Sequence, residues 1–261
     1  MTVFFHELKR NRIALIVWTA AISFMLGICV LIYPEMSSQM GEISEMFADM
    51  GSFSAAFGMD QINFGEFKGY FGVECGNVLG LGGAFFAAII GISALAKEER
   101  DRTAEYLLTH PISRKRIITE KYLSVMAQIL ILNIVVVLVT VATIFMIGEK
   151  ADFRNIALLV LAYLILQIEI ASITFGISAF LKRGGLAIGL GFAIMSYFLN
   201  IVSNLTDDAK FIKYITPFGY TDGSHILTNN SIEVKYLITG LIFTVLGIVI
   251  AYYKYTKKDI T

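Results

Sequence analysis

The sequence has few charged residues and few cysteines, and it lacks the short motifs of the common catalytic sites. Charged side chains make up 16% of the 261 residues, against about 25% in a typical soluble domain. Two cysteines, Cys29 and Cys75, are too few for a disulfide framework. The net charge of zero gives no indication of nucleic-acid binding. The chain has no G-x-x-x-x-G-K-[ST] loop for the phosphates of ATP and no H-E-x-x-H zinc motif. These absences predict that the chain by itself is not an enzyme and binds no cofactor or metal.

Long apolar runs account for the low share of charge. Hydrophobic side chains make up 56% of the chain, and a helix needs about 20 such residues to cross ~30 Å of hydrocarbon. Six runs reach or approach this length, and none contains proline: Ile13–Tyr33, Phe71–Ala96, Tyr122–Ile147, Ile156–Leu181, Leu186–Ser203 and Tyr236–Tyr253. We predict an all-α, polytopic, multi-pass protein of the cell membrane, with one transmembrane domain over residues 1–261.

The positions of lysine and arginine predict the orientation of the six spans. If the N-terminus is cytoplasmic, fifteen of the 21 basic residues fall in inner segments and six in outer segments. Cytoplasmic loops carry an excess of Lys and Arg. Both termini are therefore predicted to be cytoplasmic.

Four segments lie outside the predicted spans. Residues 1–12 alternate apolar and charged side chains in the manner of an amphipathic helix on the inner leaflet. Residues 34–70 form an acidic outer loop, in which apolar side chains recur at helical spacing after Met36. Residues 97–121 form an inner loop. Residues 204–235 form a second outer loop, which Pro217 and Gly219 break into two short pieces.

The inner loop is the most specific feature of the sequence. Glu98 and Arg102 have the i,i+4 spacing that supports a helix, and Tyr106 adds an apolar side chain at the end of that helix. Pro111 stops the helix, and Ser113 suits the N-cap of the next one. The result is a short charged helix at the membrane surface. This helix is either a contact on which a partner protein pushes, or part of an ordinary charged loop that only sets the orientation of the spans.

The inner loop resembles that of a known family. The string E-R-D-R-T-A-E-Y-L-L from Glu99 to Leu108, followed by P-I-S-R at Pro111–Arg114 and by Lys121, is similar to the inner loop of type-2 ABC exporter permeases, the ABC-2 family. Family members often have glycine before the threonine, where this chain has Arg102. The resemblance extends to the layout of six spans and implies short re-entrant helices between the fifth and sixth.

The resemblance implies that the inner helix is a coupling helix, which docks in a groove of a separate ATPase subunit. The implied ATPase-coupling residues are Glu98, Glu99, Arg102, Glu105, Tyr106, Leu107 and Leu108, with the cap at Pro111, Ser113 and Arg114. Two ATPase copies would bind ATP and Mg, and a second permease, identical or homologous, would complete a path through the membrane. The implied role is export of hydrophobic or amphipathic compounds, such as antimicrobial peptides or drugs, from a bacterial cell.

Glu169 is the one acidic residue near the centre of a predicted span. A charge there costs about 2.5–3.5 kcal/mol on insertion scales, so the side chain must face protein or water. It either lines the translocation pathway and contacts a cationic substrate, or it is protonated or bonded to Ser172, Gln167 or a neighbouring helix.

Small residues repeat every four positions in two spans. They are Gly76, Gly80 and Ala84 in the second span, and Gly185 and Gly189 at the start of the fifth. Such spacing permits close approach of two helices. These faces either pack within one subunit or form a dimer seam.

Other classes of function remain open from the sequence. An ATP-independent secondary transporter would need coupling charges in several spans and helix breaks near mid-membrane, and only Glu169 fits. A membrane scaffold or sensor without transport would not depend on an ATPase partner.

Overall fold

The computed structural model describes residues 2–49, 54, 63, 65–97, 112–182 and 185–258. In that part of the chain the regular elements are all helical, and six helical stretches are long and apolar enough to cross a membrane. The spans are formed by α1 (Thr2–Asp49), a second span of α3 (Phe67–Cys75), η1 (Gly76–Leu81) and α4 (Gly82–Ser93), α7 (Arg114–Ile147), α8 (Phe153–Ser178), α9 (Leu186–Leu205) and α11 (Val234–Lys257). The predicted all-α, six-span fold is confirmed.

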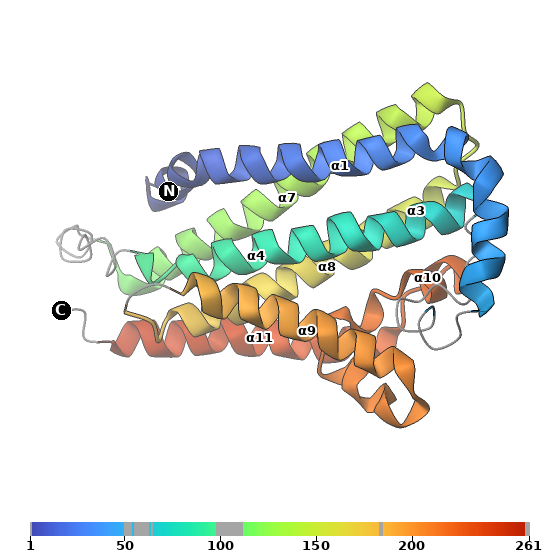
Figure 1. Cartoon of the computed structure of the whole chain (residues 1–261). Helices are drawn as coiled ribbons and strands as arrows, with labels where there is room; N and C mark the ends of the chain where they lie inside the picture. Colours follow the sequence, from blue (N-terminus) through green and yellow to red (C-terminus); the bar gives the residue numbers. More distant parts are fainter. Residues whose placement is uncertain are drawn as a thin grey trace.

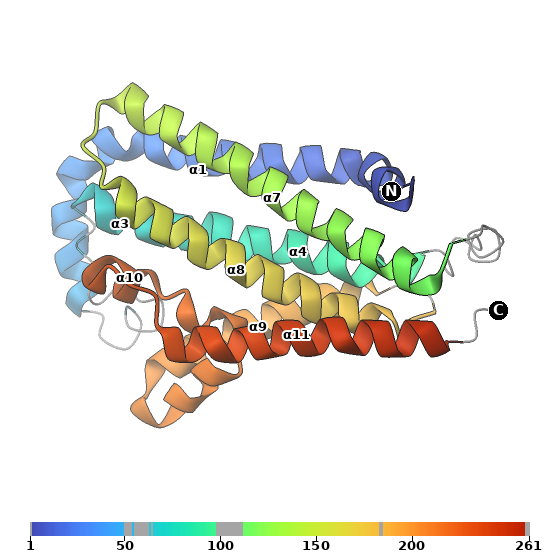
Figure 2. The same cartoon turned by 180° about the vertical axis from the view of Figure 1, so that it is seen from behind.

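The spans form one elongated bundle. Figures 1 and 2 show α1 along one edge, the second span and α8 in the middle, and α9 and α11 along the other edge. The first turns of α1 and the last turns of α11 lie at the same end of the bundle (Figure 1), as an even number of spans requires. We call this end the inner end, because the charge pattern predicts it to be cytoplasmic. The α7 helix lies beside α1 toward the outer end and runs obliquely across the bundle, so that its first turns lie near the inner ends of α4 and α11.

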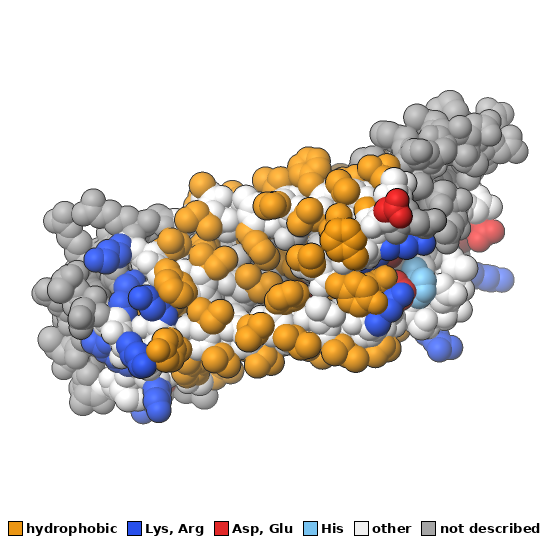
Figure 3. All heavy atoms as spheres, turned by 90° about the horizontal axis from the view of Figure 1, so that it is seen from below, with side chains coloured by type: hydrophobic (Ala, Val, Ile, Leu, Met, Phe, Trp, Pro, Cys, Tyr) orange, Lys and Arg blue, Asp and Glu red, His pale blue; other side chains and the backbone are white. Residues whose placement is uncertain are grey.

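The surface of the bundle has an apolar belt. Figure 3 shows hydrophobic side chains across the middle of one face, with charged side chains gathered at the two ends. Among the spans, the second and α8 are the most enclosed, with 67% and 56% of their apolar windows buried, whereas α9 and α11 have 22% each. The outer faces of α9 and α11 are thus available to lipid or to another subunit.

The first helix is longer than the sequence predicts. The segment predicted as an amphipathic helix over residues 1–12, from Thr2 on, and the first part of the predicted outer loop over 34–70 both belong to α1. Figure 1 shows α1 bending near its outer end, so that its last turns cross the end of the bundle. Pro34 lies inside the helix, and proline commonly kinks a helix because its ring clashes with the preceding turn. The helical spacing after Met36 indicated a helix but not its continuity with the span.

The second span contains a turn of π-helix, η1, between its two α-helical parts. Single π-helical turns are rare and often lie at functional sites. The glycines of this stretch pack on α8: a Cβ added at Gly76 or Gly80 would come within 2.9 Å of the Tyr163 ring or hydroxyl. The glycines therefore permit close packing of Tyr163 against the second span.

Three short helices connect α9 to α11 at the outer end. They are η2 (Asp207–Tyr214), η3 (Pro217–Tyr220) and α10 (Gly223–Asn229). Pro217 lies in the first turn of η3, where the missing N–H group costs no hydrogen bond. The sequence predicted two pieces around this proline, and the structure contains three. Tyr220, at the end of η3, reaches the membrane-embedded part of α8.

Candidate functional site

Most of the predicted coupling residues lie outside the described part of the chain: Glu98, Glu99, Arg102, Glu105, Tyr106, Leu107, Leu108 and Pro111. The structure places the residues that flank them. Ser113 is the N-cap of α7, as its position predicts, and its Oγ accepts a hydrogen bond from the Arg116 N–H at 3.3 Å. Arg114 begins α7 and donates to the backbone carbonyls of Lys258 at 2.6 Å and Thr256 at 3.3 Å.

A buried charge pair lies beside the start of the inner loop. The Lys121 Nζ donates to Glu7 Oε1 at 3.0 Å and to the Ala94 carbonyl at 2.7 Å, and its side chain is 1% exposed. Lys97 donates to Asn11 Oδ1 at 2.7 Å. Two buried opposite charges with good hydrogen bonds compensate each other, whereas one alone would be strongly destabilising. These contacts join α1, α7 and the end of the second span.

Glu169 lies in a closed contact between α8, α11 and η3. The Tyr220 hydroxyl donates to Glu169 Oε2 at 2.8 Å, and this oxygen faces Gly240, where any Cβ would clash with it. Burial, and to a smaller extent the neighbouring Glu169 carboxyl, raise the pKa of Tyr220 well above its usual range. The phenol therefore stays protonated and is the donor of this hydrogen bond. The other carboxyl oxygen, Oε1, is buried without a hydrogen-bond partner among the described residues.

The partners that the sequence suggested for Glu169 are engaged elsewhere. Ser172 donates to the Ile168 carbonyl and is hydrogen-bonded to Tyr122, and Gln167 accepts a hydrogen bond from Asn133 at 2.7 Å. The sequence did not indicate Tyr220, because its approach depends on how far η3 reaches into the bundle. Whether Glu169 lines the transport pathway stays a prediction.

The small residues of the second and fifth spans are in contact within the chain. Gly76 and Gly80 face Tyr163 of α8, and Ala84 is fully buried. Gly185 and Gly189 face Ile92 of α4, and a Cβ at Gly189 would also come within 3.0 Å of the Ala88 carbonyl. A dimer seam at these positions stays a prediction.

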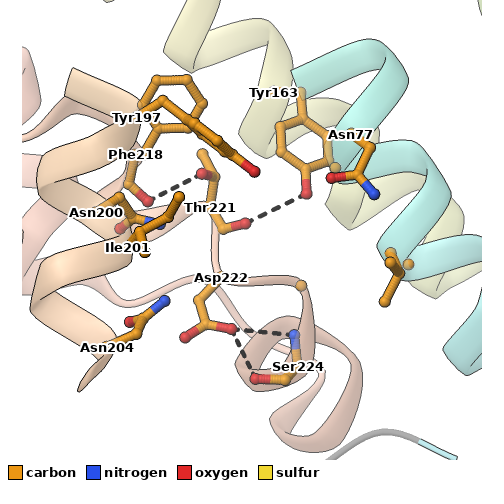
Figure 4. A pocket seen from close by; sticks show the side chains of 14 residues that line it. Asn77, Tyr163, Tyr197, Asn200, Ile201, Asn204, Phe218, Thr221, Asp222 and Ser224 are labelled. Carbon is orange, nitrogen blue, oxygen red and sulfur yellow. Dashed lines mark hydrogen bonds between the residues drawn. The ribbon is translucent and has the colours of Figure 1, made fainter. Parts of the chain in front are cut away.

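A polar pocket lies in the outer half of the bundle, between the second span, α8, α9 and the segment from η3 to α10. Its volume is about 80 Å³. In Figure 4, Tyr197 and Asn77 extend into it from opposite walls, and Asn200 and Asn204 line the α9 side. The polar groups at Asn77, Tyr197 and Asn200 make no side-chain hydrogen bond within the described residues. The pocket therefore offers neutral donors and acceptors. Asparagine in an apolar run was the sequence signal that could have indicated it.

The one acidic residue of this pocket is fully engaged. Asp222 accepts hydrogen bonds from the Ser224 N–H and Oγ and from the His225 N–H, and Lys213 lies 3.3 Å from its other oxygen. Burial by itself raises the pKa of this carboxyl, but Lys213 and the donors of Ser224 and His225 hold it below its ordinary value. Across the pocket, the Tyr163 hydroxyl donates to the Thr221 carbonyl at 3.3 Å. The described residues bring together no group of three metal-ligating side chains.

Six apolar helices around buried polar contacts define this chain as a multi-pass membrane protein. A family model for ABC-2 family transporter proteins matches residues 1–260, and the chain belongs to that family. The resemblance in the inner loop is thus confirmed at the level of the family: the chain is an ABC-2 type permease, the membrane subunit of a transporter and not itself catalytic. The family generally implies an ABC ATPase partner and dimerisation. No curated protein matches the chain.

Proposed function

We propose that the chain is the permease subunit of an ATP-driven exporter, and that two copies of a separate ATPase, which bind ATP and Mg, act on it through residues 98–108. The observation that carries the proposal is the family match over residues 1–260. The ends of the inner loop support it, because α4 ends and α7 begins at the end of the bundle where α1 begins and α11 ends (Figure 1). A soluble partner at that end can reach the loop.

Two permease subunits, identical or homologous, enclose the path for the exported compound. Large apolar side chains on α9 and α11 are exposed in the single chain, among them Phe198, Leu241 and Val245. A second subunit or lipid must cover such a surface. The substrate is a hydrophobic or amphipathic compound, such as an antimicrobial peptide or a drug. The neutral polar pocket suits the polar part of an amphipathic molecule.

Replacing Tyr106 and Leu107 by Asp tests the docking of the ATPase. Charged side chains in an apolar contact abolish binding because their desolvation is not compensated. We expect the ATPase that co-purifies with the unmodified chain to be absent from the double variant, while membrane insertion is unchanged. Lys115→Asp, at an exposed position of the first turn of α7, is the matched control and should retain the ATPase. If the double variant retains the ATPase, the coupling assignment is wrong.

A further inference from the structure

A second cavity lies at the outer end of the bundle, and we call it the outer cavity. Residues of α1, of the start of α3, of the turn between α7 and α8, of α8 and of α10 line it, and Figures 1 and 2 show α3 and α10 together at that end. Its volume is about 450 Å³, within the range of about 300–1,000 Å³ that is typical of ligand sites. It shares no lining residue with the polar pocket beside α9. The outer cavity is therefore a separate candidate for a binding site.

Apart from one asparagine, the buried part of the lining is apolar and largely aromatic. Its members are Tyr33, Phe67, Phe71, Ile156, Leu159 and Leu227. The rings of Tyr33 and Phe67 lie edge to face with their centroids 5.1 Å apart, and the rings of Phe67 and Phe71 stack at 5.7 Å. Apolar side chains bind the apolar part of a ligand, and aromatic rings also attract cations. This part of the cavity therefore suits an apolar group that carries a positive charge.

The rest of the lining is charged, and acids outnumber bases. It carries three carboxylates and two amines: Glu66, Glu149, Asp152, Lys68 and Lys150. Within the described residues these five side chains form no ion pair. Asp152 is the N-cap of α8, whereas Glu66 makes no capping hydrogen bond with its side chain. The net negative charge favours a cationic ligand over an anionic one, and Glu66 and Glu149 are the carboxylates available to it.

Asn155 is the most buried polar side chain of this lining, with 2% of its surface exposed. Its Nδ2 donates to Asp152 Oδ2 at 2.5 Å, which orients the amide. Its Oδ1 is buried and has no hydrogen-bond donor among the described residues. A buried acceptor without a donor is costly, and a ligand that supplies an N–H group removes this cost. An ammonium group supplies both the donor and the positive charge.

We propose that the outer cavity binds an amphipathic amine, with the ammonium group held by Asn155, Glu66 and Glu149 and the apolar part packed against the aromatic side chains. Two sources supply this chemistry: a compound dissolved in the water outside the membrane, or the headgroup of an aminophospholipid such as phosphatidylethanolamine. Binding at this site does not require the proposed ATPase, because every residue of the lining belongs to the outer half of the bundle.

Dansylcadaverine, a primary amine that carries a fluorescent aromatic group, tests the inference with the full chain in phosphatidylcholine nanodiscs. We expect saturable binding of one molecule per chain above the signal of empty nanodiscs, and none of N-pentyl dansylamide, which lacks the amine. Glu66→Gln and Glu149→Gln should each weaken binding about two- to fivefold, as for an exposed charge pair. Asp208→Asn, at an exposed position that does not line the cavity, is the control and should bind normally. Lys68→Gln should not weaken binding.

The source of the amine is distinguished by the lipid. Phosphatidylethanolamine added to the nanodiscs competes with dansylcadaverine and weakens its apparent affinity if the headgroup occupies the site. An unchanged affinity assigns the site to an amine from the water. Both results are consistent with an amine site, because both require saturable binding of the probe.

Asn155→Leu removes the buried acceptor and should weaken binding about tenfold or more. Because this variant can also misfold, Ala151→Leu serves as a second test: it narrows the cavity from a half-buried position of the lining and removes no polar group. It should weaken binding as well. The inference is overturned if the unmodified chain shows no saturable binding, if the double variant of Glu66 and Glu149 binds as tightly as Asp208→Asn, or if Lys68→Gln is the variant that loses binding. None of these results bears on the proposed ATPase partner.

Discussion

Within the described residues, Tyr220 is the one hydrogen-bond donor to Glu169, whose carboxyl group faces Gly240 of a neighbouring span. Glutamine has the same shape and can accept the same hydrogen bond, so Glu169→Gln should fold and insert normally. The matched variant Glu169→Leu leaves the Tyr220 hydroxyl without its partner and should lower stability by about 1–3 kcal/mol. Thermal unfolding in detergent measures both. Unchanged transport by Glu169→Gln would remove Glu169 from the pathway, whereas equal stability of the two variants would contradict the closed contact.

Asp222 is the N-cap of α10, and its folded-state pKa lies below the ordinary value of 3.8. The pKa of this carboxyl is lower in the folded than in the unfolded protein. The ionised carboxylate therefore contributes its full stabilisation above the unfolded-state pKa, and this contribution is lost as the pH falls through the folded-state pKa. Asp222→Asn should therefore be less stable by about 1 kcal/mol near neutral pH. The difference should be constant between about pH 7 and pH 5 and shrink below about pH 4. Thermal unfolding at each pH checks this, and a difference that grows in acid would contradict it.

At the scale of the elements, α8 is held by glycines on two sides. Gly91 of α4 lies over the Ala171 backbone, where a Cβ would come within 2.6 Å of the carbonyl oxygen, and Gly247 of α11 lies over the Ser172 backbone. Backbone atoms cannot rotate away, so Gly91→Ala and Gly247→Ala should each cost about 1–3 kcal/mol of stability. Gly191→Ala in α9 is the control, because a Cβ there meets nothing within 4 Å. A loss in Gly191→Ala equal to the other two would contradict the proposed packing.

The helices themselves could be predicted from the sequence to different degrees. All six spans were found, because hydropathy over about 20 residues is a property of composition. The sequence did not predict that α1 continues through Pro34. A proline permits either a kink in a helix or the end of the helix, and tertiary packing decides between the two. The π-helical turn over Gly76–Leu81 had no sequence signal beyond its glycines, which suggested only close packing.

Long-range polar contacts were the part of the site that the sequence could not predict. Lys121 belonged to the recognised motif, but its bonds to Glu7 and Ala94 depend on which spans become neighbours. The contact between Tyr220 and Glu169 and the pocket around Asn77 also depend on which spans become neighbours. Hydropathy defines how many spans there are and leaves their arrangement to side-chain packing.

At the scale of the whole molecule, the account depends on the inner loop facing the cytoplasm. A cysteine at position 105, Glu105→Cys in a Cys29→Ser chain, reports this directly when a membrane-impermeant thiol reagent is added to sealed vesicles. Cys75 is fully buried and should not react. We expect labelling in inside-out vesicles and none in right-side-out vesicles. Labelling only from the exterior would place the loop out of reach of any cytoplasmic ATPase and contradict the account.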